Sequence, residues 1–234
     1  MSRGKFITFE GGEGVGKSTQ IRLLKEKLEH KGIDCIQSRE PGGSPHAEEV
    51  RDVLLSGFAE GMGISPAGEA VLFAAARADH VDTIIKPALE TGQWVLCDRF
   101  MDSTRIYQGE SQEVTEDLVD ILERLAINGV SPDITFILDL RADVGMARAN
   151  KRRNENEAAD RFEREAMHIH ENRRNAFLKL ARKNPKRCKV IDASQTIEEI
   201  ATDIWKIVET DLLSTHMARV NKSAPTTTDE TGKD

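Results

Sequence analysis

Several features that define large classes of proteins are scarce or missing in this chain of 234 residues. Its three cysteines, Cys35, Cys97 and Cys188, lack the paired spacing of a metal site or a disulfide framework. We expect each thiol to be buried as a small apolar side chain in or beside a strand. No apolar run approaches the ~18 residues that a membrane-spanning helix needs, so no membrane association is predicted.

Basic residues are also in the minority. The chain has 33 Lys and Arg residues against 40 Asp and Glu, a formal net charge of −7. A general nucleic-acid-binding surface needs the opposite sign, so this class of protein is disfavoured. The first strand-like run begins too close to residue 1 to leave room for a signal peptide, and we therefore expect a cytoplasmic protein.

The most specific pattern present is GGEGVGKS at residues 11–18, which fits the phosphate-loop motif G-x-x-x-x-G-K-[ST]. A β-branched and aromatic run precedes it, and a helical pattern follows. In such a loop the backbone N–H groups and the helix N-terminus bind phosphate oxygens. Lys17 can reach the β- and γ-phosphates, and the Ser18 hydroxyl can bind Mg²⁺. The motif predicts a site for a nucleoside triphosphate.

Short apolar runs alternate with helical patterns, such as those at residues 118–125 and 197–208. The strand-like runs are Lys5–Glu10, Cys35–Arg39, Trp94–Asp98, Ile134–Leu140 and Cys188–Asp192. This alternation predicts an α/β fold, with a five-stranded parallel sheet flanked by helices on both faces. Ligands bind at the carboxyl ends of such strands. The phosphate loop, residues 39–44 and the Asp98-Arg99 pair should therefore line one cleft.

We expect residues 1–213 to form a single domain. Residues 150–160 are highly charged and have almost no large apolar side chains, which favours a mobile flap within a lid at about 148–160. Residues 214–234 have little to bury and are predicted to be a disordered polar tail. His168 and His170 lie in a polar helical stretch, and we interpret them as surface histidines.

Several candidate side chains allow two interpretations. Asp98 and Arg99 at a strand end suit a metal–phosphate pair, but an Asp-Arg dipeptide is equally consistent with a structural surface pair. Glu13 would repel phosphates unless it points toward a second substrate, and the alternative is a solvent-facing carboxylate. Phe73 and Arg77 share one helix face, where a core ring and a surface charge are the simpler interpretations.

Two further segments also allow more than one interpretation. The Pro-Gly-Gly run at residues 41–43 is a turn by composition. The basic residues Arg148, Lys151, Arg152 and Arg153 either close over a triphosphate or form a solvated helix face.

Taken together, these motifs resemble the bacterial thymidylate kinase family, from about Gly4 to Leu213. The matching motifs are Phe9-Glu10-Gly11, Arg39-Glu40-Pro41-Gly42-Gly43, Phe73 with Ala75-Ala76-Arg77, Asp98-Arg99 with Ser103-Thr104, Tyr107-Gln108-Gly109, and Asp160-Arg161-Phe162-Glu163. The resemblance implies a P-loop nucleoside-monophosphate-kinase fold and phosphorylation of dTMP by ATP with Mg²⁺ in dTTP biosynthesis. It also implies a homodimer, with ATP and dTMP as the small-molecule partners.

The same resemblance implies roles for individual residues. The ATP site would comprise Gly11, Gly12, Glu13, Gly14, Val15, Gly16, Lys17, Ser18 and Thr19. The dTMP site would comprise Glu13, Arg39, Pro41, Phe73, Arg77, Arg99, Thr104, Tyr107, Gln108 and Glu163. Ser18 and Asp98 would bind the metal, and Lys17, Arg99, Asp98 and Glu13 would act in catalysis. Within the acceptor site, Phe73 would stack on thymine, Arg77 would bond its carbonyl edge and Arg99 would bind the monophosphate. Glu13 would meet the 3′-hydroxyl, and Tyr107 would pack near the deoxyribose.

Members of this family carry a basic residue either in the phosphate loop or in the lid. Gly14 occupies the loop position in question, so the resemblance implies the lid-supplied type. Arg148, Arg152 or Arg153 would then be the cation that stabilises the transition state.

Two rival functions follow from the same phosphate loop. One is a nucleoside or nucleotide kinase of the same fold with another acceptor. The other is a GTPase-like switch, which needs an N-K-x-D motif and a D-x-x-G motif. Asn150-Lys151 lacks the aspartate of the first motif, and the only match to the second, Asp229–Gly232, falls in the predicted tail.

Overall fold

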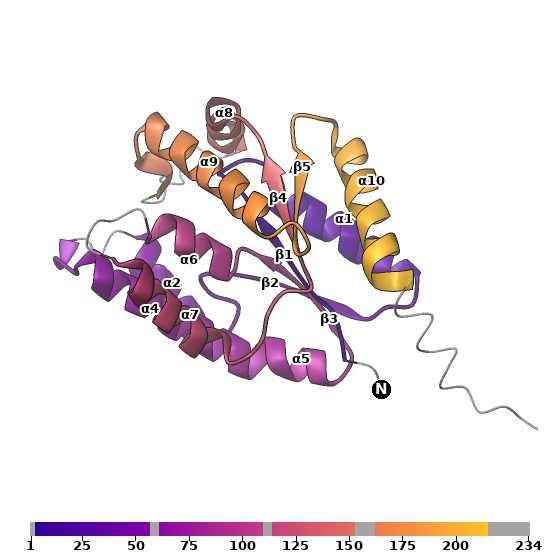
Figure 1. Cartoon of the computed structure of the whole chain (residues 1–234), viewed down its shortest axis with the longest axis horizontal. Helices are drawn as coiled ribbons and strands as arrows, with labels where there is room; N and C mark the ends of the chain where they lie inside the picture. Colours follow the sequence, from indigo (N-terminus) through magenta and orange to yellow (C-terminus); the bar gives the residue numbers. More distant parts are fainter. Residues whose placement is uncertain (1–2, 57–60, 110–113, 153–161, 215–234) are drawn as a thin grey trace, which may run out of the picture.

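The computed structural model describes residues 3–56, 61–109, 114–152 and 162–214. Its centre is a sheet of five parallel strands in the order β2-β3-β1-β4-β5 (Figure 1). The strands are β1 (Phe6–Glu10), β2 (Cys35–Arg39), β3 (Trp94–Asp98), β4 (Ile134–Asp139) and β5 (Cys188–Asp192). The predicted α/β fold is confirmed. The first strand begins one residue later, and the fourth ends one residue earlier, than the apolar runs indicate.

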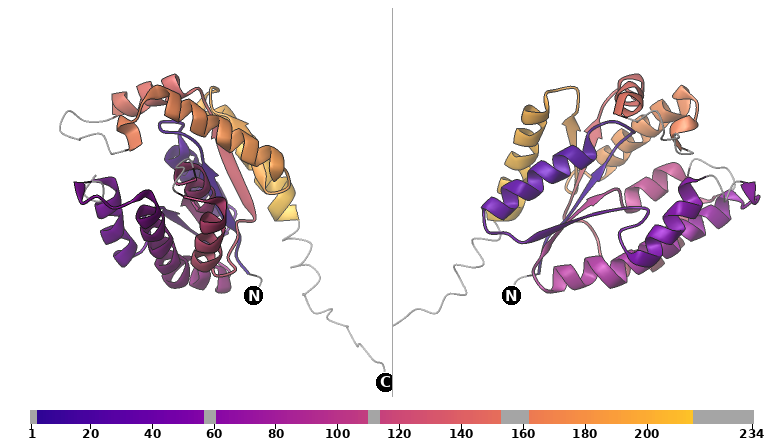
Figure 2. Two further views of the ribbon diagram at one scale, coloured as in Figure 1. Left: turned by 60° about the vertical axis from the view of Figure 1, so that its left-hand side comes forward. Right: turned by 180° about the vertical axis from the view of Figure 1, so that it is seen from behind.

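Helices connect these strands and cover both faces of the sheet (Figures 1 and 2). The α-helices are α1 (Lys17–His30), α2 (Pro45–Leu55), α4 (Pro66–His80), α5 (Lys86–Glu90), α6 (Met101–Tyr107), α7 (Glu116–Ile127), α8 (Ala142–Arg152), α9 (Met167–Lys183) and α10 (Ile197–Val208). Two π-helical turns, η1 (Val81–Ile85) and η3 (Glu209–Leu213), and the 3₁₀ turn η2 (Phe162–Arg164) complete the described part.

The sheet packs differently on its two faces. On one face, Ile7 and Phe9 of β1 belong to the apolar cluster that includes α1 and α10, which lie side by side. On the other face, Phe6 joins η1 and α5 in a second cluster. Successive side chains of a strand point to opposite faces, so β1 also buries Thr8 and Glu10, both 0% exposed, on the side of Phe6. Two polar groups of this strand are therefore enclosed in the protein.

The sequence explains where α4 begins. The Ser65 hydroxyl accepts a hydrogen bond from the Gly68 N–H, and Pro66 follows at the first helical position. From that start the helix buries both Phe73 and Arg77 on its inner face. The shared helix face predicted for Phe73 and Arg77 is thus confirmed, and α4 carries both candidate site residues inward.

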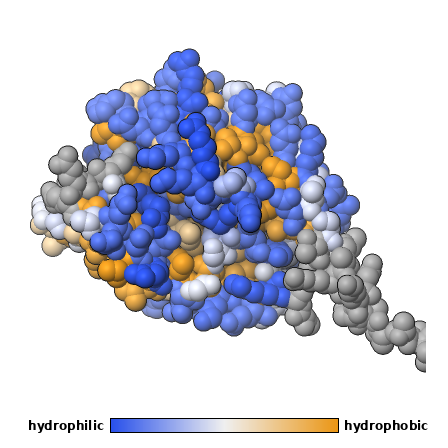
Figure 3. Space-filling view, in the orientation of Figure 1, coloured by the Kyte–Doolittle hydropathy of each residue, from blue (hydrophilic) through white to orange (hydrophobic). Residues whose placement is uncertain are grey.

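The helical pattern at residues 118–125 is confirmed in α7, but only part of it is buried. Val119, Leu122 and Ala126 pack against α4, whereas Ile121 is 47% exposed and Leu125 is 71% exposed. Val71 of α4 is 49% exposed as well. The space-filling view shows apolar atoms over the α4–α7 pair at the lower left (Figure 3). These two helices therefore present an apolar outer surface, defined here by Val71, Ile121 and Leu125.

The cysteine prediction is confirmed, since Cys35, Cys97 and Cys188 are all buried free thiols. Burial raises the pKa of each one. Within the described ranges, no helix is both long and apolar enough to cross a bilayer. The predicted tail beyond Ser214 and the predicted lid beyond Arg152 lie outside the described residues.

Candidate active site

The loop between β1 and α1 turns at glycines whose backbone conformation suits few other residues. Gly14 and Gly16 have φ values of 66° and 98°. Gly16 is the N-cap of α1, and a Cβ added to it would meet no atom within 4 Å, so the space beside it is open. The unpaired N–H groups of the first turn of α1, together with the positive end of its dipole, make this open space a site for an anion.

Lys17 opens α1 and is almost fully buried, at 7% exposed. Its Nζ donates to the Gly12 carbonyl oxygen at 2.9 Å and lies 4.0 Å from Oδ1 of Asp98. Burial, together with the charge of Arg99, lowers the pKa of Lys17. The loop therefore holds a desolvated cation curled against its own backbone, where a phosphate would be its natural partner.

Ser18 and Asp98 converge from α1 and from the end of β3. The Ser18 hydroxyl donates to Oδ2 of Asp98 at 2.8 Å. No cluster of three or more His, Cys, Asp or Glu side chains suited to a metal occurs in the described part of the chain. One carboxylate and one hydroxyl fit Mg²⁺, which keeps most of its shell as water and substrate phosphate. These two oxygens are therefore a suitable partial ligand set for Mg²⁺ bound to a nucleotide.

Arg99 follows Asp98 in a conformation that is unusual for a residue with a side chain. Its φ is 67°, and its N–H donates to the Phe9 carbonyl oxygen at 2.9 Å. This turn directs the guanidinium back over the phosphate loop, where Nη1 donates to the Gly11 carbonyl oxygen at 3.1 Å and Nη2 to Glu13 at 2.5 Å. The side chain is 14% exposed. Backbone strain of this kind is typical of functional positions.

Glu13 faces protein cations. Its Oε1 accepts from Arg99 and also from the Tyr107 hydroxyl at 3.4 Å, and its side chain is only 18% exposed. Burial alone would raise the pKa of Glu13, but the charges of Arg99 and Lys17 lower it to about 2. Of the two interpretations open from the sequence, the solvent-facing carboxylate is wrong, and Glu13 lies on the Arg99 side of the loop.

Glu10, at the end of β1, supports the same segment from below. It is fully buried and accepts from the Phe100 N–H at 2.8 Å and from the Ser103 hydroxyl at 2.6 Å. The Ser103 oxygen in turn accepts from Nη1 of Arg99 at 3.2 Å. Burial, and secondly the charge of Asp102, raise the pKa of Glu10 to about 7. Glu10 thus anchors the turn that carries Arg99, a role that the sequence motif alone does not reveal.

We expect Glu10 to make the stability of the fold depend on pH. Its ordinary pKa is 4.5, so between pH 4.5 and about 7 the folded protein holds a proton that the unfolded chain has released. Its contribution to the free energy of unfolding therefore falls as pH rises through this window, by roughly 3 kcal/mol. Glu10→Gln keeps the shape and removes this step. The free energy of unfolding can be measured with denaturant at pH 4.5 and pH 8. The difference between variant and parent should shift in favour of the variant at the higher pH.

The exposed Glu26 of α1 offers a matched control. Its side chain is 50% exposed, so Glu26→Gln should track the parent at both pH values. If the free energies of unfolding of Glu10→Gln and the parent differ by the same amount at both pH values, Glu10 does not hold the proton that we assign to it.

The acceptor side of the site is built from aromatic rings and a buried arginine. The ring centroids of Phe73 and Phe162 lie 6.3 Å apart, and Tyr107 meets Phe162 edge-on at 5.4 Å. Arg77 is 3% exposed, and its Nη1 donates to Oγ1 of Thr104 at 2.7 Å. A flat apolar ring beside fixed N–H donors is an environment suited to a nucleobase.

One cleft brings the two halves together. Every residue predicted to contact the acceptor lines it, namely Glu13, Arg39, Pro41, Phe73, Arg77, Arg99, Thr104, Tyr107, Gln108 and Glu163. Residues 13–18 of the phosphate loop and Asp98 line the same cleft, whereas Gly11, Gly12 and Thr19 do not. The side chains that the sequence predictions omit from this lining are Glu40, Arg51, Leu55, Ser103 and Phe162. The expectation that the strand ends open onto one cleft is confirmed by this arrangement.

The lid arginines differ in position. Arg152 lines the cleft, whereas Nη1 of Arg148 donates to the Ala193 carbonyl oxygen at 3.1 Å. Arg153 lies outside the described residues. A Cβ at Gly14 would overlap the carbonyl oxygen of Gly145 in α8. The loop position that can carry a basic side chain is thus closed by the lid helix in this chain, and Arg152 brings a cation into the cleft from that same helix.

The interpretation of His170 as a surface histidine is wrong. His170 is 7% exposed, and its Nε2 has no hydrogen-bond partner in the described structure, whereas His168 is exposed. It shares the inner face of α9 with Arg173 and Phe177, three and seven residues further on. That spacing is the signal from which its burial could be predicted.

The sheet, the phosphate loop and the shared cleft define a P-loop phosphotransferase of the nucleoside-monophosphate-kinase type. Comparison with known proteins specifies the family: the thymidylate kinase family model matches residues 9–204, and the chain belongs to that family. Membership excludes the GTPase-like switch.

Individual relatives agree with this assignment. Thymidylate kinases of Rhodopseudomonas palustris, from strains TIE-1 and ATCC BAA-98 / CGA009, are each 52% identical over 211 residues, which is 90% of this chain and 91% of each relative. The crystal structure of thymidylate kinase from Ehrlichia chaffeensis is 35% identical, with a TM-score of 0.68, and the match covers 89% of this chain and 99% of that one.

Proposed function

We propose that this chain transfers the terminal phosphoryl group of ATP to dTMP, in line, across the cleft between the phosphate loop and Arg99. The observation that carries the proposal is the proximity of two cationic side chains, Lys17 at the start of α1 and Arg99 directly after β3. Lys17 lies 4.0 Å from Asp98, whose neighbour Arg99 donates to the backbone of the same loop. Two anionic substrates that must meet end to end need such a pair of cations on an otherwise acidic protein.

The donor side would bind ATP through the N–H groups of the phosphate loop and through Lys17. Ser18 and Asp98 would hold Mg²⁺, which neutralises charge on the β- and γ-phosphates when bound. Lys17 would exchange its bond to the Gly12 carbonyl for phosphate oxygens. Since its cationic form is disfavoured by burial, a phosphate partner restores the stabilisation that water would have given.

On the acceptor side, Arg99 would clamp the monophosphate. Within the described part of the chain, its hydrogen bonds use Nη1 twice and Nη2 once, which leaves the Nε–H for a phosphate oxygen. Phe73 would stack on the thymine ring, and Arg77 would donate to a carbonyl on its edge. Glu13 and Tyr107 would contact the deoxyribose.

The lid would supply the cation that stabilises charge developing during transfer. Arg152 is our choice among the described arginines because it lines the cleft, whereas Arg148 donates to the Ala193 carbonyl. Closure over the substrates would exclude water and suppress ATP hydrolysis.

A panel of acceptors tests this function. ADP release coupled to a spectrophotometric readout should be far faster with dTMP than with dCMP, AMP, thymidine or shikimate. Faster turnover of any of these would favour the rival kinase of the same fold with another acceptor. Binding that does not distinguish ATP from GTP would count against ATP as the donor.

We also propose that the chain works as a cytoplasmic homodimer, joined through the apolar surface of Val71, Ile121 and Leu125. Exposed large apolar side chains on two helices that pack against each other are typical of a surface that a partner covers. We expect Leu125→Asp to convert the dimer into a monomer because it would place a charge in that contact.

Sedimentation velocity at micromolar concentration measures the effect. Ile197→Asp is the matched control, since Ile197 is 52% exposed on α10 and an acidic residue in the first turn of a helix is favourable. It should sediment like the parent. A parent that sediments as a monomer, or a dimeric Leu125→Asp variant, would count against this interface.

A further inference from the structure

We propose that His80 is a positioning residue for acceptor recognition: through Glu40 it fixes the direction in which Arg77 presents its N–H groups to the base. This inference rests on the proposed function, in which Arg77 contacts the thymine ring. His80 does not line the cleft, and it is 0% exposed at the end of α4. It acts through a relay of hydrogen bonds that begins at β2.

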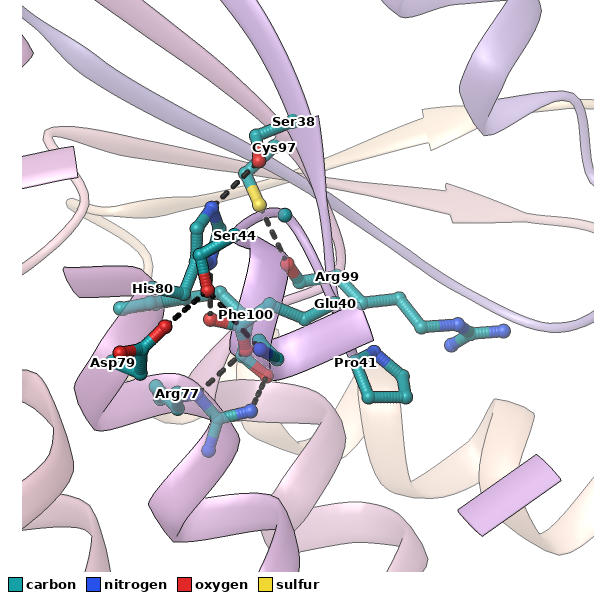
Figure 4. A network of polar contacts seen from close by, with 12 residues as sticks. Ser38, Glu40, Pro41, Ser44, Arg77, Asp79, His80, Cys97, Arg99 and Phe100 are labelled. Atoms are coloured by element: carbon teal, nitrogen blue, oxygen red, sulfur yellow. Dashed lines mark hydrogen bonds and ion pairs between the residues drawn. The ribbon is translucent and has the colours of Figure 1, made fainter. Parts of the chain in front are cut away.

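The relay has one link on each side of His80 (Figure 4). His80 Nδ1 lies 3.0 Å from Oε1 of Glu40, and its Nε2 lies 2.6 Å from Oγ of Ser38. The second carboxylate oxygen of Glu40 accepts from Nε of Arg77 at 2.7 Å. All four side chains are at most 9% exposed, so bulk water has little access to these hydrogen bonds and competes little with them.

The donors and acceptors of the relay are consistent with only one neutral arrangement. The Glu40 carboxylate accepts hydrogen bonds on both oxygens, so Nδ1 of His80 carries the proton that it donates. Nε2 is then an acceptor for the Ser38 hydroxyl. Glu40 therefore selects the tautomer of His80, the Ser38 hydroxyl adapts to it as a donor, and the Nδ1–H bond fixes the orientation of Glu40.

The loop after β2 closes over this relay and leaves no room around it. Gly43 has a φ of 90°, and a Cβ there would overlap both Nε2 of His80 and Oγ of Ser38. The next residue, Ser44, donates to Oδ2 of Asp79 at 2.5 Å, which ties the loop to the end of α4. The Pro-Gly-Gly turn thus reverses the chain and also packs over the His80 ring.

The other hydrogen bonds of Arg77 within the described residues come from the far end of its side chain, and its guanidinium also lies over the Phe100 ring. Nη1 donates to Thr104 at 2.7 Å, and Nη2 to the Phe100 carbonyl oxygen at 3.1 Å. One N–H remains on each of these nitrogens for a ligand. Because Glu40 fixes the Nε edge, a rotated Glu40 would turn the remaining donors away from the base.

Two substitutions of similar shape isolate the donor. Asn can place an N–H near the position of Nδ1, whereas Leu cannot. We expect His80→Leu to raise the KM for dTMP about tenfold and leave the KM for ATP and the kcat within about threefold. His80→Asn should stay within about threefold of the parent in all three constants. The ratio of kcat/KM for dTMP to that for dCMP should fall in the Leu variant only, because an arginine donor discriminates a carbonyl from an amino group.

Equal effects of the Leu and Asn variants, or parallel rises in both KM values, would overturn the positioning role in favour of a general structural one. Thermal unfolding of both variants checks that they fold. If His80→Leu does not fold, Ser38→Ala decides: a KM for dTMP raised about two- to threefold supports the relay, and an unchanged KM overturns it. Thr83→Ala, on the exposed side of η1, is the matched control. If the parent enzyme does not phosphorylate dTMP, the proposed function itself is wrong. The assay of the parent shows this before any variant is compared, so the two failures can be told apart.

Discussion

Arg99→Ala is expected to remove measurable turnover of dTMP, with kcat/KM lower by at least about a thousandfold. The guanidinium is the cation that connects the two halves of the cleft, through Gly11 and Glu13 of the phosphate loop. Without it, a dianionic acceptor would meet the carboxylates of Glu13 and Asp98 with no guanidinium to offset their charge. Repulsion would then replace a bidentate clamp.

The same substitution should change the loop. The charge of Arg99 is the foremost cause that lowers the pKa of Glu13 against the effect of burial. In Arg99→Ala the pKa of Glu13 should rise, so the pH dependence of ATP binding should move as well as the turnover. Titration of ATP affinity by calorimetry from pH 4 to pH 8 measures this second effect.

Controls separate lost chemistry from lost structure. Arg99→Lys keeps the charge but cannot provide the planar fork, and it should recover only a small part of the activity. Arg22→Ala, on the exposed side of α1 with a side chain 58% exposed, should leave kcat and both KM values unchanged. An active Arg99→Ala enzyme with unaltered dTMP saturation would contradict the assigned clamp.

The parts of the fold that the sequence predicts are those set by local pattern. The phosphate loop is defined by glycines that the backbone requires and by a lysine at fixed spacing, so its position and its anion chemistry follow directly. The strands are short apolar runs bounded by polar residues, and each was located to within one residue at either end. Since parallel strands end at one edge of the sheet, the shared cleft follows from the same pattern.

The residues that the sequence hides are polar groups buried by contacts between distant segments. Glu10 lies next to the phosphate loop in sequence, but its partners come from beyond β3, Phe100 as the N-cap of α6 and Ser103 within that helix. His80 is three residues beyond Arg77 on a helix, and nothing local indicates that β2 and the residue directly after it supply its partners, Ser38 and Glu40. Burial of a titratable side chain depends on which segments pack over it, and a single sequence does not give that packing.

The sequence also does not show where two backbone segments approach each other closely, because that too depends on the packing of distant segments. Gly14 matches a variable position of the phosphate-loop motif, where any residue is allowed. The structure packs it against Gly145 of α8, and a Cβ at Gly145 would overlap the Glu13 carbonyl oxygen in return. The pair of glycines is therefore one contact between the phosphate loop and the lid helix, and it links the choice of residue in the loop to the supply of a cation from the lid.

Lys17→Ala is the second substitution for which we expect a very large effect, a fall in kcat of about a thousandfold or more. The ammonium group is the side-chain cation that sits within the loop itself, bonded to the Gly12 carbonyl at 2.9 Å, where it can follow the γ-phosphate during transfer. Stopped-flow or coupled assays at saturating ATP measure kcat directly. Lys25→Ala on the same helix, where the side chain is 33% exposed and pairs with Glu29, should match the parent.

The stability of this variant should change in the opposite direction to its activity. Burial lowers the pKa of Lys17, which means that the fold disfavours the charge that catalysis needs. Removing the ammonium group relieves that cost while it leaves the apolar core intact, so the midpoint of thermal unfolding should be equal to or higher than that of the parent. ATP with Mg²⁺ should stabilise the parent far more than the variant, because only the parent gains the lysine–phosphate contact. A variant that unfolds at a clearly lower temperature would mean that Lys17 supports the loop as a structural group, and its loss of activity would then not identify a catalytic cation.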